Sequence, residues 1–306
     1  MVVGADTTNP NLASIPYAAA RTATGTWSVI DTTALGARAM LAVTHAGTNW
    51  YATTNGPGPL NGFVGVSADG APPAAFTAVD SGQPDHLCAI DHNSQFAIAS
   101  LFGNIITAPT DLSSFSSHSA NGPGSYVPVG VATNGGATSY VCVGLGGAPT
   151  GICQSPDGAT WTNQAANYST ENDFLVTSNT VLWTGTQFFG AEGNQVGVSV
   201  DGQTWTLSAM NATDANVVAF DAVNGLYYVG DTDGNVYVSA TIAGLATAPP
   251  NPISLNNLRC AASFQGVTLM GDDGGGVFVT TNGGASWTAE TTGLGPVVLT
   301  GASGRL

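Results

Sequence analysis

Carboxylates are the side chains of this sequence with the clearest capacity for chemistry. Two carboxylates beside aromatic rings can hold a sugar by hydrogen bonds and stacking, or act as acid and base in glycoside hydrolysis. The residues that we expect on one ligand-binding face are Tyr126, Tyr168, Glu171, Asp173, Glu192, Asp231, Asp233 and Asp272, together with His118 and Asp273. No catalytic motif joins any of them, so we predict no catalytic residue.

Two short acidic segments invite comparison with metal sites. Residues 231–235, of sequence DTDGN, resemble the start of a calcium loop, but the later bidentate glutamate is missing. Residues 272–274 are equivalent, and both segments equally suit a tight hairpin turn. The four histidines, at positions 45, 86, 92 and 118, lack the spacing of metal ligands. We predict neither a metal ion nor a cofactor.

The chain has four cysteines, and two of them flank one predicted turn. Cys142 and Cys153 would face each other across a hairpin, so a cross-strand disulfide is one option and a pair of thiols the other. Cys88 and Cys260 each lie within an apolar run, which favours small core residues.

One short pattern recurs seven times along the chain. Its sharpest copies are Ser155–Trp161 and Ser199–Trp205, both of the form SxDGxTW, and Thr280–Trp287 is one residue longer. Weaker copies begin at residues 21, 67, 107 and 239, so neighbouring copies start about 40 to 48 residues apart. This period fits one four-stranded unit. The sequence therefore predicts an all-β protein, a seven-bladed β-propeller of antiparallel blades with almost no helix.

The two ends of the chain are predicted to share a blade. In the sixth unit the expected strands are Val217–Asp221, Leu226–Gly230 and Asn235–Ser239. The first unit lacks a first strand, and Pro296–Gly301 has the right character to supply it. We predict a single domain over residues 1–306, in which blade 1 combines residues 1–33 with residues 295–306, because this closure removes unpaired edges.

The SxDGxTW segments resemble the Asp-box repeats of sialidases, sortilin-type receptors, photosystem assembly factors and many phage and secreted propellers. In such a turn the acidic side chain caps backbone N–H groups, the glycine takes a positive φ and the tryptophan packs between sheets. The resemblance assigns this structural role to Asp69, Asp157, Trp161, Asp201, Trp205, Asn282 and Trp287.

The resemblance does not carry a family activity over to this chain. Sialidase activity would require three arginines on one face, and we expect only Arg38 and Arg259, of four arginines in all, to reach it. The basic patch expected of a photosystem assembly factor is also missing. The fold is therefore better specified than the function.

The charge balance narrows the choice of partners. The chain has 19 acidic residues, four arginines and no lysine, for a formal net charge of −15. A surface so poor in cations is unsuited to nucleic acid or anionic membranes. The missing lysine suits a protein exposed to proteases that cut after lysine and arginine. We expect a virion or extracellular location, no membrane insertion and, since residues 1–20 do not resemble a signal peptide, export by another route.

Strand order assigns the turns to two faces. Turns between strands one and two and between strands three and four lie on one face, which carries the boxes and which we call the box face. The opposite face, here called the loop face, carries the other turns and the connections between blades. We expect its long segments at residues 53–62, 116–125, 162–179 and 246–257, and a ligand there, because loops vary on rigid sheets.

These observations predict a non-catalytic binding or structural propeller, with a bacteriophage virion component (a tail, receptor-binding or decoration protein) as the leading hypothesis. Its partners would be other virion or structural proteins or a cell-surface glycan, with homo-oligomers in a symmetric assembly as a further option. The alternatives are a secreted glycoside hydrolase or lyase, and a glycan-binding lectin that uses the loop face.

Overall fold

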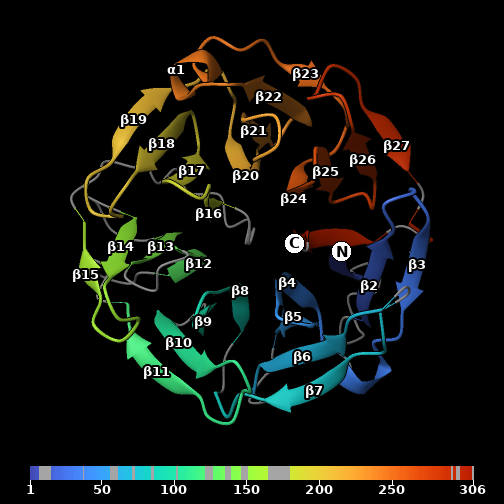
Figure 1. The fold of residues 1–306 in the computed structure, drawn as a ribbon, viewed down its shortest axis with the longest axis vertical. Helices are drawn as coiled ribbons and strands as arrows, with labels where there is room; N and C mark the ends of the chain where they lie inside the picture. The colour runs from blue at the N-terminus through green and yellow to red at the C-terminus, as the bar shows by residue number, and fades with distance from the viewer. Residues whose placement is uncertain are drawn as a thin grey trace.

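The architecture is a ring of seven four-stranded antiparallel sheets, a β-propeller, seen in a computed structural model (Figure 1). The structure describes residues 1–6, 15–36, 38–55, 61–70, 73–83, 86–100, 103–120, 127–134, 139–145, 151–164, 180–290, 292–293 and 297–304. The predicted fold class is confirmed. Helical structure in the described residues is limited to η1 (Thr33–Leu35) and α1 (Ile242–Leu245). None of the helices found there has the length and apolar character to cross a membrane.

The blades are numbered along the chain, and their strands are given from the centre of the ring outwards. Blades 1 to 3 consist of β28 (Val298–Ala302), β1 (Val2–Asp6), β2 (Ile15–Arg21) and β3 (Trp27–Ile30); β4 (Met40–Ala46), β5 (Asn49–Thr54), β6 (Phe63–Ala68) and β7 (Thr77–Asp80); and β8 (Leu87–His92), β9 (Gln95–Ser100), β10 (Asn104–Pro109) and β11 (Ser116–Ser119). Blades 4 and 5 consist of β12 (Val127–Thr133), β13 (Tyr140–Leu145), β14 (Ile152–Ser155) and β15 (Thr162–Asn163); and β16 (Val181–Trp183), β17 (Phe188–Glu192), β18 (Gln195–Ser199) and β19 (Thr206–Ala209). Blades 6 and 7 consist of β20 (Ala215–Asp221), β21 (Leu226–Asp231), β22 (Asn235–Ser239) and β23 (Asn251–Pro252); and β24 (Leu258–Phe264), β25 (Val267–Asp272), β26 (Val277–Thr280) and β27 (Thr288–Glu290).

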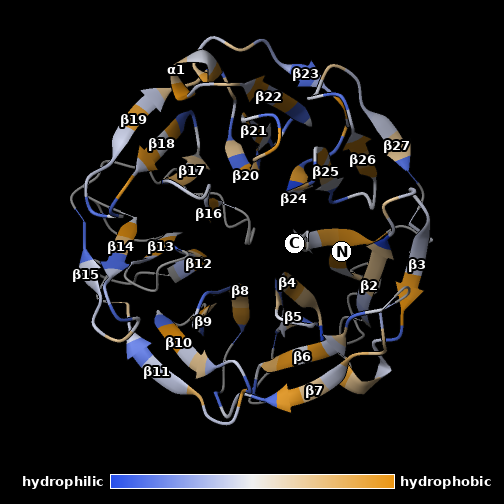
Figure 2. Ribbon diagram, in the orientation of Figure 1, coloured by the Kyte–Doolittle hydropathy of each residue, from blue (hydrophilic) through white to orange (hydrophobic). Residues whose placement is uncertain are grey.

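Every blade buries both of its faces against its neighbours. In β9 the large residues Phe96 and Ile98 join the apolar cluster shared with blade 2, whereas Ala97 and Ala99 join the cluster shared with blade 4. Such two-sided burial explains why the strands are short continuous apolar runs rather than alternating ones. Figure 2 shows hydrophobic residues along the strands of every blade.

The core is divided into seven apolar clusters, one at each junction between adjacent blades, which we call seams. The innermost strands supply small residues such as Ala42 and Ala89 as well as larger ones such as Met40 and Leu87, and Tyr237 packs farther from the centre. Close packing at this density makes each seam sensitive to volume changes.

The predicted closure of the ring is present. Strand β28 pairs antiparallel with β1, with Val2 opposite Ala302 and Val3 opposite Gly301 (Figure 1). Gly4 is required at this pairing, because a Cβ there would collide with the carbonyl oxygen of Val298. Two segments almost 300 residues apart thus form one blade, and the first and last repeats meet at one seam.

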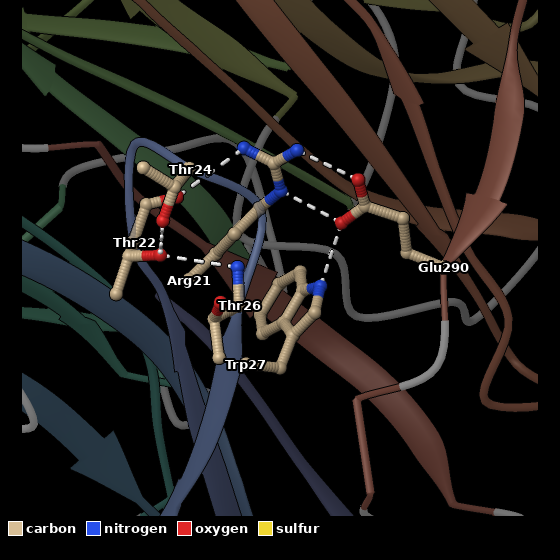
Figure 3. Close-up of polar contacts among 6 residues, drawn as sticks. All are labelled: Arg21, Thr22, Thr24, Thr26, Trp27 and Glu290. Atoms are coloured by element: carbon tan, nitrogen blue, oxygen red, sulfur yellow. Dashed lines mark hydrogen bonds and ion pairs between the residues drawn. The ribbon is translucent and has the colours of Figure 1, made fainter.

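A polar cluster reinforces the seam between blades 7 and 1. The Arg21 guanidinium donates from Nε to Glu290 Oε2 at 2.7 Å and from Nη2 to Glu290 Oε1 at 2.6 Å. Figure 3 shows the indole N–H of Trp27 converging on the same carboxylate, at 2.7 Å from Oε2. Hydrogen bonds from Arg21, opposed by partial burial, hold the pKa of Glu290 below its ordinary value. The charged form is thus the form that the closed ring stabilises.

A second carboxylate bridges two blades near the centre. Asp91, in β8, accepts hydrogen bonds through Oδ2 from the backbone N–H of Thr133 at 2.8 Å and from its hydroxyl at 3.2 Å. Its Oδ1 accepts from the His92 N–H at 2.8 Å. Desolvation nevertheless outweighs these bonds and raises the pKa of Asp91 to about 6.

Replacing Glu290 with Gln should weaken ring closure, because the substitution leaves the largely buried guanidinium of Arg21 without its counter-charge. We expect a loss of about 2 to 3 kcal/mol in the free energy of unfolding at neutral pH. A lowered pKa stabilises the fold above the unfolded value of 4.5 and ceases to do so as the pH falls through the folded value. The difference between wild type and variant, measured by urea unfolding, should therefore shrink in acid. Asp233→Asn, an exposed change remote from this seam, is the control, and equal losses in both variants would contradict the role of Glu290.

Replacing Asp91 with Asn should change how stability depends on pH. The folded pKa of about 6 lies above the ordinary value of 3.8, so the folded state binds the extra proton between these values. Wild-type stability should therefore fall by roughly 1 to 3 kcal/mol as the pH rises through this window. The Asn variant should lack that slope, and urea midpoints across the window test this. Because His92 titrates in both proteins, its contribution cancels in the comparison, and parallel profiles would refute the expectation.

Candidate functional site: the loop face

The box turns form a self-contained hydrogen-bond pattern. Asp157 Oδ1 accepts from the N–H groups of Ala159 and Thr160, each at 2.8 Å, and Trp161 Nε1 donates to the Gly158 carbonyl at 2.9 Å. These bonds, led by that from Thr160, lower the pKa of Asp157. Gly158 has a φ of 77°, which other residues adopt only with strain.

The second sharp copy repeats this geometry at Asp201. Its Oδ1 accepts from the N–H groups of Gln203 at 2.8 Å and Thr204 at 2.9 Å, and Trp205 Nε1 donates to Gly202 O at 3.1 Å. Asp157 and Asp201, and likewise Trp161 and Trp205, therefore make the same contacts in the two sharp copies; their structural role stays a prediction.

Weaker copies keep part of the pattern. Asn282 Oδ1 accepts from Ser286 N at 3.0 Å, while Trp287 packs edge-on against Tyr228 with its ring centroid 6.2 Å away. Among the described residues, the indole N–H of Trp287 has no acceptor. The Asp69 carboxylate contacts His45 Nε2 at 3.0 Å, and residues 71–72 of its turn lie outside the described residues.

Box turns also join each blade to the one before it. The Gln95 amide of blade 3 donates to the Asp157 carbonyl of blade 4 at 3.2 Å, and the Ser139 hydroxyl of blade 4 donates to the Asp201 carbonyl of blade 5 at 2.9 Å. Blades 2 and 3 are joined in the same way by Tyr51 Oη and Thr110 O, at 3.4 Å. Carbonyl groups of three box-face turns thus help to hold blades 2 to 5 together.

Blade 6 departs from the expected assignment of long segments. Residues 246–257 were expected on the loop face, but β23 begins only at Asn251, so residues 246–250 belong to the connection between strands three and four on the box face. The degenerate box is replaced by α1, where the Thr241 hydroxyl caps Gly244 N at 3.0 Å and Leu245 is buried. In blade 3, residues 116–119 are likewise strand β11 rather than loop.

Much of the predicted ligand set cannot be placed. Tyr126, Tyr168, Glu171 and Asp173 lie outside the described residues, and Glu192 is described only in its backbone, at the loop-face end of β17. His118 lies in the outer strand β11, with Nε2 2.9 Å from the Thr107 hydroxyl. A ligand-binding role for these residues stays a prediction.

Asp231 and Asp272 are on the loop face, but the carboxylate of each accepts hydrogen bonds from neighbouring groups of the protein. Asp231 is fully buried and accepts from the N–H groups of Asp233 and Asn235 at 3.0 and 2.8 Å, and from the Tyr237 hydroxyl at 3.1 Å. Desolvation, with this carboxylate as the next cause, raises the pKa of Tyr237 to about 12, so the hydroxyl remains a donor.

Asp272 repeats this arrangement one blade later. It is 2% exposed and accepts from the N–H groups of Gly274 and Gly276 at 3.0 and 2.6 Å, and from the Ser254 hydroxyl at 2.6 Å. Both acidic segments are therefore turns held by a buried carboxylate. Of the two alternatives, a metal loop or a hairpin turn, these contacts fit the hairpin turn. The described residues contain no group of three or more His, Cys, Asp or Glu side chains placed to hold a metal ion.

A group of polar side chains lies on the loop face where blades 6 and 7 meet. We call this cluster, formed by Asn216, Asn257, Arg259 and Asp273, the blade 6–7 junction. Asn216 Nδ2 donates to Asn257 Oδ1 at 3.1 Å, and Arg259 Nη2 lies 3.6 Å from Asp273 Oδ2. Desolvation, opposed by Asp273, lowers the pKa of Arg259. Its buried Nε has no hydrogen-bond acceptor among the described residues, so the guanidinium is only loosely engaged.

Backbone bulges position this junction. An extra residue interrupts the pairing near the start of six of the seven innermost strands, at positions 41, 88, 129, 216, 259 and 300. A bulge re-aims its side chain, and several of these reach the next blade. Thr300 Oγ1 donates to Met40 O at 2.6 Å, and Cys88 Sγ donates to Pro128 O at 3.0 Å.

Arg38 and Arg259 were expected to reach this face, whereas Asn216, Asn257 and Asp91 were not singled out from the sequence. Arg38 lies 3.8 Å from the centre of the Phe63 ring, which stacks beneath its guanidinium. The sequence did contain a signal for Asp91. This carboxylate lies near the end of the otherwise apolar strand β8, where the equivalent positions of β12 and β20 carry alanine. The bulge residues gave no signal, since both apolar types, as at positions 41, 88 and 129, and polar types, as at positions 216, 259 and 300, occur among them.

Comparison with known proteins identifies the fold and no family. No protein-family model matches the sequence, and no curated protein matches it significantly. Solved structures do match. YCF48 bound to D1 peptide has a TM-score of 0.59 and 13% identity, over 94% of this chain and 86% of that chain.

Two further structures show the same likeness. The crystal structure of a nidogen/laminin complex matches with a TM-score of 0.55 and 11% identity, over 87% of this chain and 97% of that chain. YCF48 from Cyanidioschyzon merolae matches with a TM-score of 0.57 and 12% identity, over 83% of this chain and 85% of that chain. At such low identity, the likeness shows that the chain is a propeller and shows no shared activity.

Proposed function

We propose that this chain is a non-catalytic propeller that binds a protein partner through its loop face. The observation that carries the proposal is the Arg259 guanidinium, which lies at a bulge on the loop face with Nη2 3.6 Å from Asp273 Oδ2. Hydrogen bonds join adjacent blades on both faces, so this guanidinium stands out by how little of its donor capacity is used.

A loosely engaged arginine suits partner recognition. A guanidinium presents five donors in a planar fork, and only part of this capacity is used at the blade 6–7 junction. Because Nε is buried, a carboxylate or backbone carbonyl from a partner would accept hydrogen bonds from the Nη groups of this side chain, which is 13% exposed. Two structures with the same fold are of complexes, one with the D1 peptide and one of nidogen with laminin, which supports a binding role without naming a partner.

The setting that we propose is a bacteriophage virion, outside the bacterial cytoplasm, where the chain is a tail, receptor-binding or decoration protein. Two sequence features support it: the repeats are degenerate, and the chain has no lysine among its 306 residues. Proteases that cut after lysine and arginine would find only four sites in the whole chain. A partner would then be another virion protein or a cell-surface glycan.

Carboxyl labelling tests which face binds. Coupling with a carbodiimide and glycinamide suits a chain with 19 acidic residues and no lysine. Asp80 and Asp233 are exposed at the loop face, whereas Asp157 and Asp201 are exposed at the box face and serve as matched controls. We expect the loop-face pair to be protected in the assembly purified from the native source and labelled in the isolated chain. The box-face pair should be labelled equally in both.

Two outcomes would contradict the proposal. Protection confined to Asp157 and Asp201 would place the interface on the wrong face, and equal labelling of all four residues would show that the face is not covered. Electron microscopy of the same purified assembly tests the setting separately. A free monomer that hydrolyses a polysaccharide would overturn the virion proposal and favour the glycoside hydrolase.

A further inference from the structure

Three of the four cysteines lie in one apolar cluster at the seam between blades 3 and 4. Cys88, Cys142 and Cys153 are fully buried there, among Ala97, Ile105 and other apolar residues. Cys88 comes from blade 3, and the other two come from adjacent strands of blade 4. All three side chains are thiols in this structure.

Cys142 and Cys153 are directly opposite each other in the pairing of β13 with β14. Directly opposed residues project from the same face of an antiparallel pair. Their membership of the same cluster, which faces blade 3, agrees with this. The two thiols therefore point the same way from neighbouring strands.

The pair occupies a hydrogen-bonded position in the ladder. Gly144 N donates to Gly151 O at 2.8 Å, and such pairs recur at every second residue, so Cys142 and Cys153 form the next one. The Cα atoms of a hydrogen-bonded pair are about 5.5 Å apart, within the usual range for a disulfide. The Cβ atoms are typically about 5 Å apart, whereas a relaxed disulfide needs about 3.8 Å.

We infer that Cys142 and Cys153 are a site of oxidation, at which a disulfide forms between β13 and β14 as the chain folds. The Cα spacing lets the bond form without a change of register. The Cβ gap means that the bond strains the ladder locally. Cys88 is not part of the bond, because it lies at the bulge of β8 in blade 3 and is not opposite either of the other two cysteines.

The chemistry is thiol–disulfide exchange with a low-molecular-weight disulfide such as oxidised glutathione. The thiolate of one cysteine attacks that disulfide, forms a mixed disulfide and releases one reduced glutathione. The second cysteine, after losing its proton, attacks the protein sulfur of the mixed disulfide and releases the second glutathione. The protein loses two protons and two electrons, and the oxidant gains them. Because both thiols are buried in the native fold, the exchange takes place as the chain folds.

Peptide mapping tests this at single-residue level. Wild-type protein is unfolded under reduction, refolded in excess oxidised glutathione, quenched in acid, alkylated in denaturant and digested with a protease that cuts before aspartate. Residues 111–156 form one such peptide that contains both Cys142 and Cys153, while Cys88 lies in residues 85–90 and Cys260 in residues 233–271. We expect the first peptide to escape alkylation and to be lighter by two hydrogen atoms, with Cys88 and Cys260 alkylated.

Controls separate the register argument from chance oxidation. Cys88→Ser should give the same map, whereas Cys142→Ser should leave Cys153 alkylated. Alkylation of all four cysteines in the wild type, a glutathione adduct in place of the intramolecular bond, or a disulfide that includes Cys88 would each overturn the inference.

Discussion

Burial of each sheet on both faces is the constraint on which the rest of this structure depends. The core consists of seven seams, so no blade has a core of its own and each is stable only between two neighbours. The chain therefore must return to its start. It does so through the pairing of β28 with β1 and through the bidentate contact between Arg21 and Glu290, which links the third strand of blade 1 to the last strand of blade 7.

The turns of the two faces contribute to this ring in different ways. The box turns supply carbonyl groups to the blade before them, so that their polarity stabilises the ring. The loop face also carries bonds between adjacent blades, made by Thr300, Cys88 and Asn216. Its tight turns are held individually, by the buried carboxylates of Asp231 and Asp272. Individually locked turns can differ from blade to blade without disturbing a neighbour, which is the property that a recognition surface needs.

The repeat made the ring, its strand order and its closure predictable, because each copy of SxDGxTW fixes one turn and the period fixes what lies between. Local departures from the repeat were not predictable. In blade 6 the segment after Ser239 has no acidic residue or tryptophan at the box positions, and the sequence alone does not show that a helical turn with a buried Leu245 takes their place. The site was harder still. Asp231 and Asp272 have the composition of ligand residues, and only the partners supplied by Tyr237 and Ser254 reveal that they are structural.

The closed ring of blades has a further consequence. Neighbouring sheets of such a ring diverge from the axis towards the rim, so each blade with its seam fills a wedge, and the angle of that wedge determines how many copies complete a circle. Gene duplication alone could not enlarge this ring, because eight wedges of the present angle would overfill it. Growth by one unit would require thinner rims or thicker centres in every copy at once. The number of blades, seven here, is in this sense recorded across the whole chain rather than in any one repeat.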